Sequence, residues 1–310
     1  MKIVFMGTPW FAVPTLEYLL FNGYEIAAVY TQPDRESGRG RSVITSPVKR
    51  KAIEYDLPVE QPDNFKEETT RDRLAAYNPD YLLIYSYGQI LSQMVIDIPS
   101  RDCLAIHPSL LPRHRGAAPV VSAILSGDEF TGTTLISVAL KVDSGNILGQ
   151  VQVPVTDYDT TEILTAKLSL LSAQMVLDVL PRLMNGEIIP RQQDSSQSNY
   201  FGQMSKQDGE IDWNMSAVDI WRRVRAYNPW PGCYTKWKGK QLKILKARPV
   251  SSGENIPPGR MVILPDKQLG IGTGSGMLAV SEVQLEGKRV MPAGDFIQGQ
   301  RDLIEAVLPS

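Results

Sequence analysis

The only two histidines of the 310-residue chain, His107 and His114, lie in the stretch CLAIHPSLLPRHRGAAP at residues 103–119. His107 ends an apolar run and is followed by a proline, so we expect it at the carboxyl end of a strand. Imidazole changes its charge near neutral pH, which makes it a natural general acid or base. Asp143, in the glycine-containing turn DSGN, follows another strand-like run and could reach the same edge. Such a pair suits proton transfer during acyl transfer, although a structural histidine and a turn-forming aspartate are the somewhat more common interpretation of these residues alone.

Two loops could form walls beside His107. The loop PSLLP, residues 108–112, is stiffened by two prolines and offers two leucines as an apolar surface. The segment SYGQIL, residues 86–91, follows the strand-like run YLLIY, and its Gly88 permits close approach of a ligand to the backbone. Packing of both loops onto the core is the alternative. The sequence contains no G-x-S-x-G motif and no neighbouring Cys–His pair, so we expect direct attack by a substrate amine or by water.

The charge of the chain is unevenly distributed. The net charge is only −2, which argues against a general nucleic-acid binder. Locally, however, residues 35–51 contain six basic residues and one acid, and residues 221–248 contain nine basic residues and no acid. A phosphate-bearing ligand responds to such local charge, although ordinary solvated surface is an equally good interpretation of each segment alone.

The composition also limits the possible sites and compartments. Cys103 and Cys233 have no metal-binding or redox spacing, and only two histidines are present, so we expect neither a metal site nor a disulfide. This cysteine usage indicates the reducing cytoplasm. No uninterrupted apolar run reaches about 18 residues, and we therefore expect no membrane span.

The first half of the chain alternates apolar β-rich runs with helical patterns. The strand-like runs are residues 2–7, 25–31, 81–86, 103–107, 131–142 and 147–155, and the helical patterns are residues 11–21, 46–55, 66–77 and 161–185. This alternation predicts an α/β fold with a doubly wound, mostly parallel sheet, whose ligands bind at the carboxyl ends of the strands. A G-x-G-x-x-G fingerprint and a P-loop are both missing after the first strand, which argues against an NAD enzyme and an NTPase.

The second half of the chain differs from the first in composition and in its pattern of apolar residues. Residues 191–207 are polar, rich in Gln and Ser and aperiodic, so we expect a linker there. A short helix over residues 217–225 and several short strand-like runs with turn signals follow, and they predict a small OB-like β-barrel. The expected domains are therefore residues 1–190, a linker over residues 191–207, and a C-terminal barrel over residues 208–310.

With these motifs in place, the chain resembles the methionyl-tRNA formyltransferases, a group within the formyltetrahydrofolate-dependent formyltransferase family. The resemblance runs essentially from end to end. It is carried by GTPWFAVPTL, TQPDRESGRG, SPVK, SYGQIL, HPSLLPRHRGAAP, VDSGN, EIDW and RAYNPWPG. The segments HPSLLP and VDSGN are typical of formyltransferases in general. The loop QPDRESGRG and the segment NPWPG are more specific to the tRNA enzymes, and they coincide with the two basic segments.

The resemblance implies a Rossmann-like formyltransferase domain followed by a tRNA-binding barrel. It implies formyl transfer from 10-formyltetrahydrofolate to the α-amine of methionyl initiator tRNA, with His107 and Asp143 as catalytic residues and no metal. The implied folate-binding residues are Tyr87, Gly88, Gln89, Ile90, Leu91, Ser109, Leu110, Leu111 and Pro112. The implied tRNA-binding residues are Arg35, Arg39, Arg41, Arg222, Arg223, Arg225, Lys236 and Lys238. A cytoplasmic monomer without membrane contact is expected.

One residue departs from the family pattern. The family has N-x-H-P-S-L-L-P, whereas this chain has Ala105-Ile106-His107. The family's asparagine offers an amide N–H to the developing oxyanion, and loss of one such donor typically costs about 10²–10³ in rate. Ala105 is thus an engineered change, a natural one compensated by an imidazolium at His107, or the mark of a non-catalytic folate- and tRNA-binding homologue. A sugar-nucleotide N-formyltransferase is the other enzymatic alternative, but it would not need the two basic segments.

Overall fold

The computed structural model describes residues 1–37, 42–251, 256–265, 268–300, 303 and 306–309. Arg39 and Arg41, two of the expected tRNA contacts, lie outside the described residues. The chain divides into two compact units. Unit 1 comprises residues 1–119, 130–154 and 165–201, and unit 2 comprises residues 120–129, 155–164 and 202–310.

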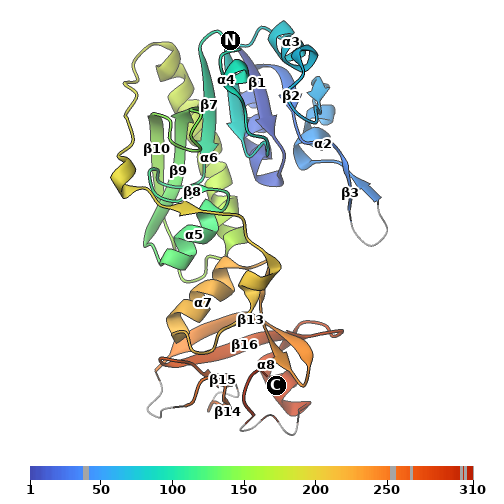
Figure 1. Ribbon diagram of the computed structural model, residues 1–310, viewed down its shortest axis with the longest axis vertical. Helices are drawn as coiled ribbons and strands as arrows, with labels where there is room; N and C mark the ends of the chain where they lie inside the picture. The colour runs from blue at the N-terminus through green and yellow to red at the C-terminus, as the bar shows by residue number, and fades with distance from the viewer. Residues whose placement is uncertain (38–41, 252–255, 266–267, 301–302, 304–305, 310) are drawn as a thin grey trace. The chain divides into compact units, whose positions relative to one another are not determined.

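Unit 1 is built on a seven-stranded sheet (Figure 1). Its strand order is β10-β9-β7-β6-β1-β2-β5. The strands are β1 (Lys2–Gly7), β2 (Glu25–Tyr30), β5 (Val59–Glu60), β6 (Tyr81–Tyr85), β7 (Asp102–His107), β9 (Phe130–Ser137) and β10 (Ile147–Pro154). The five strands from β7 to β5 run parallel, whereas β9 is antiparallel to both β7 and β10. The predicted mostly parallel α/β sheet is therefore confirmed.

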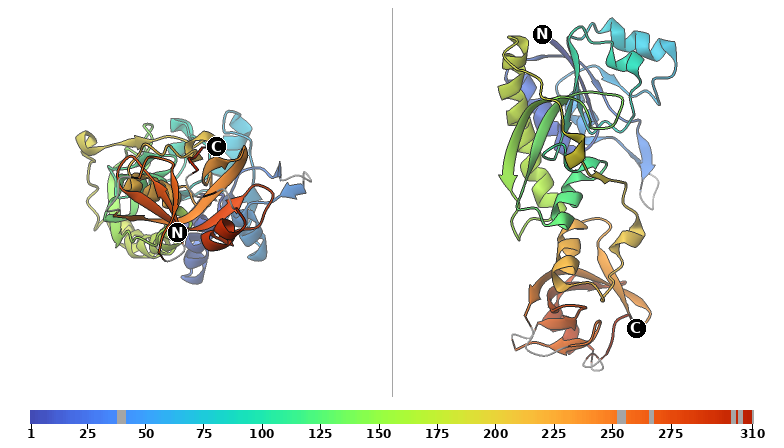
Figure 2. Two further views of the ribbon diagram at one scale, coloured as in Figure 1. Left: turned by 90° about the horizontal axis from the view of Figure 1, so that it is seen from below. Right: turned by 60° about the vertical axis from the view of Figure 1, so that its left-hand side comes forward.

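Helices cover both faces of this sheet because its strands are apolar on both sides. In β1, for example, Ile3 and Phe5 join a core with α1, α2 and α6, while Val4 and Met6 join a separate core with α3 and α4. Figure 2 shows the helices on the two sides. The helices of this unit are η1 (Trp10–Ala12), α1 (Val13–Phe21), α2 (Pro47–Glu54), α3 (Glu68–Ala76), α4 (Gln93–Ile96), η2 (Ser195–Gln197) and, from residue 165 on, α6 (Thr161–Met184). The small strands are β3 (Arg35–Ser37), β4 (Ser42–Ile44), β8 (Arg115–Gly116) and β11 (Tyr200–Phe201).

Local sequence explains where the elements begin. The Ser46 hydroxyl accepts the Lys49 backbone N–H, and Pro47 occupies the first turn, so α2 starts there. Helix α6 is long and apolar enough to cross a membrane by length and composition alone. Half of its most apolar stretch is buried inside the protein, and Met175 and Val179 pack in the core of the sheet, so we interpret α6 as the core helix of unit 1.

Unit 2 contains an antiparallel sheet. Its strand order is β12-β13-β16-β15-β14, and β17 pairs with β16. The elements are α5 (Pro119–Ser126), η3 (Lys206–Gly209), α7 (Ala217–Ala226), β12 (Cys233–Trp237), β13 (Lys240–Val250), β14 (Met261–Ile263), β15 (Leu269–Gly272), β16 (Met277–Leu285), β17 (Met291–Pro292) and α8 (Ala293–Gln298). The expected short strands are present, and the described ones form a path from β12 to β14.

The expected linker is largely part of unit 1. Residues 191–201 belong to that unit, and β11 pairs in parallel with β8. Upstream, Arg191 and Ile147 exchange two backbone hydrogen bonds of 2.8 and 2.9 Å. The segment that we expected to connect two domains loosely is thus hydrogen-bonded to the loop that follows β7 and to the first residue of β10.

Candidate active site

His107 is the last residue of β7, at the carboxyl edge of the parallel strands. It lies opposite Thr134 of β9 in the antiparallel pair, and its side chain is only 6% exposed. Ala105 precedes it by two residues and pairs with Ile84 of β6 and Ile136 of β9. Because side chains alternate along a strand, positions 105 and 107 face the same side of the sheet, about 7 Å apart.

Both ring nitrogens of His107 face oxygen atoms. Nδ1 lies 3.5 Å from the Asp143 Oδ1 atom, and Nε2 lies 2.8 Å from the His114 carbonyl oxygen. A neutral imidazole donates from only one nitrogen, whereas the imidazolium donates from both. The arrangement therefore suits a positively charged ring held between a carboxylate and a carbonyl group.

Asp143 is fixed by the backbone of its turn and by a neighbouring loop. Its φ angle is +52°, which is uncommon for a non-glycine residue, and its Oδ2 atom accepts the Gly116 N–H at 2.8 Å. In the same turn, a Cβ atom at Gly145 would lie 1.6 Å from the Ser137 carbonyl oxygen, so only glycine fits there. The structure thus brings the two predicted catalytic side chains together.

The loop PSLLP is tied to β9 and β10. The Leu111 N–H donates to Thr134 Oγ1 at 3.2 Å, and that hydroxyl donates to the Ser109 carbonyl oxygen at 2.6 Å. The Gln150 side-chain amide donates to the Leu111 carbonyl oxygen at 2.8 Å. These bonds anchor the loop to β9 and β10 beside the end of β7.

Apolar side chains surround position 105. The cluster consists of Ala105, Leu111, Ile136 and Ile147. Leu111 is buried, while Leu110 and Pro112 are half-buried. Ala105 itself is partly exposed. Because its side chain is a methyl group, it adds neither a hydrogen-bond donor nor an acceptor to the region next to His107.

A cavity of about 810 Å³ adjoins the segment that follows β6. It is lined by Asp63, Asn64, Phe65, Lys66, Arg71, Gln89, Ile90, Leu91, Ser92, Met94 and Leu140. Three of the expected folate-binding residues therefore line one cavity. Tyr87 does not line it, because its side chain is 1% exposed and packs in the core. Gly88 has a φ angle of +93°, which favours glycine.

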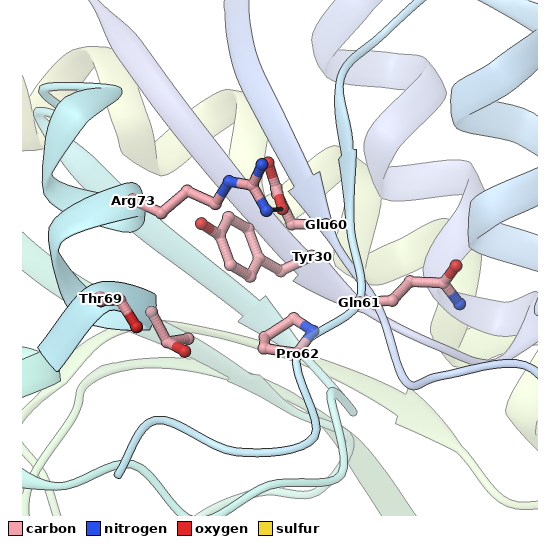
Figure 3. A pocket seen from close by; sticks show the side chains of 7 residues that line it. Tyr30, Glu60, Gln61, Pro62, Thr69 and Arg73 are labelled. Carbon is pink, nitrogen blue, oxygen red and sulfur yellow. Dashed lines mark ion pairs between the residues drawn. The ribbon is translucent and has the colours of Figure 1, made fainter. Parts of the chain in front are cut away.

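A second cavity, of about 440 Å³, lies beside β2 and α3 (Figure 3). Its Glu60 carboxylate accepts the Tyr77 hydroxyl at 2.8 Å and pairs with Arg73 at 3.3 Å. Tyr30 also lines it, and burial raises the pKa of that phenol. The main charged groups of this cavity already have partners in the protein, and its lining includes no residue of the 810 Å³ cavity.

The expected tRNA-binding cations differ in exposure. Arg35, Lys236 and Lys238 are exposed. Arg225, in contrast, is 9% exposed: its guanidinium lies 4.0 Å from the centre of the Trp221 ring and donates to the Thr156 carbonyl oxygen at 2.8 Å. Burial lowers the pKa of this guanidinium. Arg225 therefore stabilises unit 2 internally and is not available as a surface contact for phosphates.

Arg222 and Arg223 are half-buried. Arg222 pairs with Asp219 at 3.7 Å, and Arg223 donates to the Asp208 carbonyl oxygen at 3.2 Å. Among the described residues, no group of three or more His, Cys, Asp or Glu side chains could hold a metal ion. Both cysteines are free and buried, and burial raises the pKa of the Cys103 thiol to about 12, so it is a poor nucleophile.

Sequence reasoning missed the residues that support this site. Arg115 and Gln193 are 3% and 7% exposed, and Gln193 donates hydrogen bonds to the turn that carries Asp143. Asn199 accepts the His114 N–H. The polar, aperiodic composition of residues 191–207 gave no signal that two of its amides bind the loops that carry His114 and Asp143.

Comparison with known proteins places this geometry in context. The formyl transferase family model matches residues 1–180, and the model of the formyl transferase C-terminal domain matches residues 203–301. A methionyl-tRNA formyltransferase of Dehalococcoides mccartyi is 43% identical over 302 residues, which cover 97% of this chain and 96% of that protein.

Solved structures show the same fold at low identity. WlaRD, a sugar 3N-formyl transferase solved in the presence of dTDP and 5-N-formyl-THF, matches with a TM-score of 0.68 at 19% identity, over 93% of this chain and 99% of that chain. HypX from Aquifex aeolicus in complex with tetrahydrofolic acid matches with a TM-score of 0.65 at 18% identity, over 99% of this chain. The present chain spans about half the length of HypX, 48%.

Proposed function

We propose that this chain, which belongs to the methionyl-tRNA formyltransferase family, transfers the formyl group of 10-formyltetrahydrofolate to the α-amine of methionyl initiator tRNA. The observation that carries the proposal is the 43% identity to a tRNA enzyme over 97% of the chain. The similarity to the sugar formyltransferase is 19% identity, which supports the fold alone. The reaction prepares initiator tRNA for translation initiation.

His107 and Asp143 are the proposed catalytic pair. Attack of the amine bonds its nitrogen to the formyl carbon and places negative charge on the formyl oxygen, and a fixed positive charge nearby lowers the barrier. Collapse of this intermediate breaks the bond between the formyl carbon and N10 of the folate, and the proton that leaves the amine passes to N10 through water. The imidazolium of His107, held by the Asp143 carboxylate and the His114 carbonyl group, supplies that charge at the end of β7. The Asp143 contact keeps the ring oriented. A covalent enzyme intermediate is not part of the proposal.

The 810 Å³ cavity is the proposed site for part of the folate. Ile90 and Leu140 are 89% and 64% exposed there, which offers apolar surface to a flat ring. Lys66 and Arg71 line the same cavity and suit the carboxylates of the glutamate tail. The loop PSLLP, at the end of the adjacent strand β7, is the proposed second wall toward the reacting carbon.

Exposed cations are the proposed tRNA contacts. Arg35 in β3, together with Arg39 and Arg41, belongs to the loop that we propose reaches the acceptor stem. In unit 2, Lys236 and Lys238 are the exposed members of the predicted set. Such phosphate contacts make binding depend steeply on salt concentration. The chain is proposed to act as a cytoplasmic monomer, and sedimentation equilibrium at micromolar concentration would reveal a dimer if this is wrong.

Ala105 is the proposed reason for reduced activity. The side chain at this position faces the same side of the sheet as His107, yet its neighbours Leu111, Ile136 and Ile147 are apolar. The oxyanion therefore relies on the charge of His107 without a carboxamide donor from position 105. We propose slow formylation by this chain rather than complete inactivity.

The test is a formylation assay with two acceptors. The chain is incubated with 10-formyltetrahydrofolate and either methionyl initiator tRNA or a dTDP-amino sugar, and formylated product is measured by mass spectrometry. Formylation of the tRNA alone supports the proposal. Formylation of the sugar nucleotide alone overturns the acceptor assignment, and tight binding of tRNA and folate without any product shows a non-catalytic binding protein.

A further inference from the structure

We propose that residues 191–201, here called the return segment, position both catalytic residues. The return segment follows α6 and ends with β11, which lies beside β8 (Figure 1). Its residues Gln193 and Asn199 do not touch the reacting atoms in this proposal. They act through Asp143 and His114 and are therefore positioning residues. The catalytic roles assumed here rest on the proposed function, whereas the hydrogen bonds are independent of it.

Gln193 holds the turn of Asp143. Its side-chain amide nitrogen donates to the carbonyl oxygens of Asp143 and Gly145, at 2.8 and 2.7 Å. Its amide oxygen accepts two hydrogen bonds from Arg115, at 3.2 Å from Nε and 2.7 Å from Nη2. Both N–H donors and both acceptor positions of the Gln193 side chain therefore have a partner. Because Gln193 is 7% exposed, water cannot readily replace these partners.

The same contacts link the Asp143 turn to the loop after β7. Arg115 and Gly116 form β8, which pairs with Tyr200 and Phe201 of the return segment. The Gly116 N–H donates to Asp143 Oδ2 at 2.8 Å. The return segment therefore determines where the Gly116 donor lies. Asp143 is held at its backbone carbonyl by Gln193 and at its carboxylate by the Gly116 N–H.

Asn199 holds the other catalytic residue through one intermediate. Its side-chain oxygen accepts the His114 N–H at 2.5 Å, and its backbone carbonyl accepts the Arg115 N–H at 3.0 Å. His114 has a φ angle of +58°, so its backbone conformation needs support from its surroundings. The carbonyl oxygen of His114 is the partner of His107 Nε2. Asn199 thus fixes the group that orients the catalytic ring.

The side-chain amides of Gln193 and Asn199 support opposite sides of the His107 ring. Gln193 sets the position of the carboxylate on the Nδ1 side of His107, and Asn199 sets the carbonyl group on the Nε2 side. A displacement of about 1 Å in such an arrangement can lower the rate about 10²-fold, and neither amide contacts the substrates in this proposal. We therefore expect substitutions that remove the side-chain hydrogen bonds of Gln193 or Asn199 to lower kcat and to leave KM nearly unchanged.

The first test compares Gln193→Glu with Gln197→Glu. Glutamate at position 193 keeps the acceptor for Arg115 but loses both donors to the Asp143 turn, so we expect kcat about 10²-fold lower at unchanged KM for folate and tRNA. Gln197 is exposed in the same segment and bonds only Asp194 among the described contacts, so the same charge change there controls for electrostatics. Equal kcat values for the two variants would overturn the proposal.

The second test uses a conservative pair at position 199. Asn199→Asp retains the acceptor for the His114 N–H, whereas Asn199→Leu has a similar shape and no acceptor. We expect near wild-type kcat for the aspartate variant and a loss of about tenfold or more for the leucine variant, with both folded by circular dichroism. Loss of activity in both, or in neither, contradicts positioning through this hydrogen bond.

A spectroscopic readout separates this proposal from the proposed function. The chain has only two histidines, so its imidazole Cε1–H region in NMR contains two signals. Gln193→Glu is expected to move the His107 signal and Asn199→Leu both signals, whereas Gln197→Glu should move neither. These shifts are measurable even if the wild-type chain formylates no acceptor. Unchanged signals in the 193 and 199 variants would overturn the inference regardless of activity.

Discussion

Restoring a carboxamide at position 105 should accelerate formyl transfer. The side chain at this position faces the same side of the sheet as His107, about 7 Å along the strand, and its surroundings are partly open. One preorganised oxyanion donor is worth about 10²–10³ in rate, or about 2.7–4 kcal/mol. Placing the amide beside Ile136 and Leu111 costs about 1 kcal/mol of folding free energy, which a folded domain tolerates. We therefore expect Ala105→Asn to be about 10²–10³-fold faster.

The assay is single-turnover formylation of methionyl-tRNA at saturating folate and fixed salt. Ala105→Leu is the matched control, because leucine resembles asparagine in shape but has no donor; its rate should not exceed that of the wild-type chain. An asparagine variant that is folded, binds folate normally and is no faster than the wild-type chain would refute the reasoning. In that case the oxyanion is stabilised by a group other than residue 105.

Three further outcomes follow from the structure. Gly116→Ala should lower the free energy of unfolding by about 2–4 kcal/mol in urea titrations, because φ is +103° and the new Cβ would lie 2.4 Å from the Phe201 carbonyl oxygen; an unchanged midpoint would contradict this packing. Lys238→Gln should reduce the slope of log affinity for tRNA against log salt concentration by about one. Equal slopes for the variant and the wild-type chain would show that Lys238 does not contact a phosphate. A hydrogen bond from the Lys2 N–H holds the pKa of Asp80 below its usual value. The ionised carboxylate therefore stabilises the folded state above about pH 4, and this stabilisation is lost as the pH falls through the folded-state pKa. Asp80→Asn should flatten that part of the curve of unfolding free energy against pH, and a curve identical to that of the wild-type chain would exclude the effect.

The elements of the sheet could be predicted because their patterns are local. The runs at residues 2–7 and 25–31 are apolar throughout, as strands buried on both faces require, and they became β1 and β2 with nearly the predicted bounds. The position of His107 at a strand end also followed from the apolar run and the proline after it. Asp143 was placed by its glycine-containing turn.

The supporting contacts could not be predicted because they join distant residues through polar groups. Arg115 and Gln193 are separated by 78 positions and are buried, although arginine and glutamine are usually exposed. Nothing in the local sequence distinguishes the buried Gln193 from the exposed Gln197 in the same segment. Likewise, the basic stretch that contains Arg225 suggested a phosphate-binding surface, whereas the fold uses that side chain to bind backbone carbonyls.

The most direct measurement of the central claim is the initial rate of formylation by the wild-type chain with methionyl initiator tRNA and 10-formyltetrahydrofolate, set against its His107→Ala variant. We expect the wild-type chain to form formyl-methionyl-tRNA slowly but faster than the uncatalysed reaction, and we expect the rate to fall to background in the variant. Equal rates in the two proteins, or no product while a dTDP-amino sugar is formylated, would contradict this expectation.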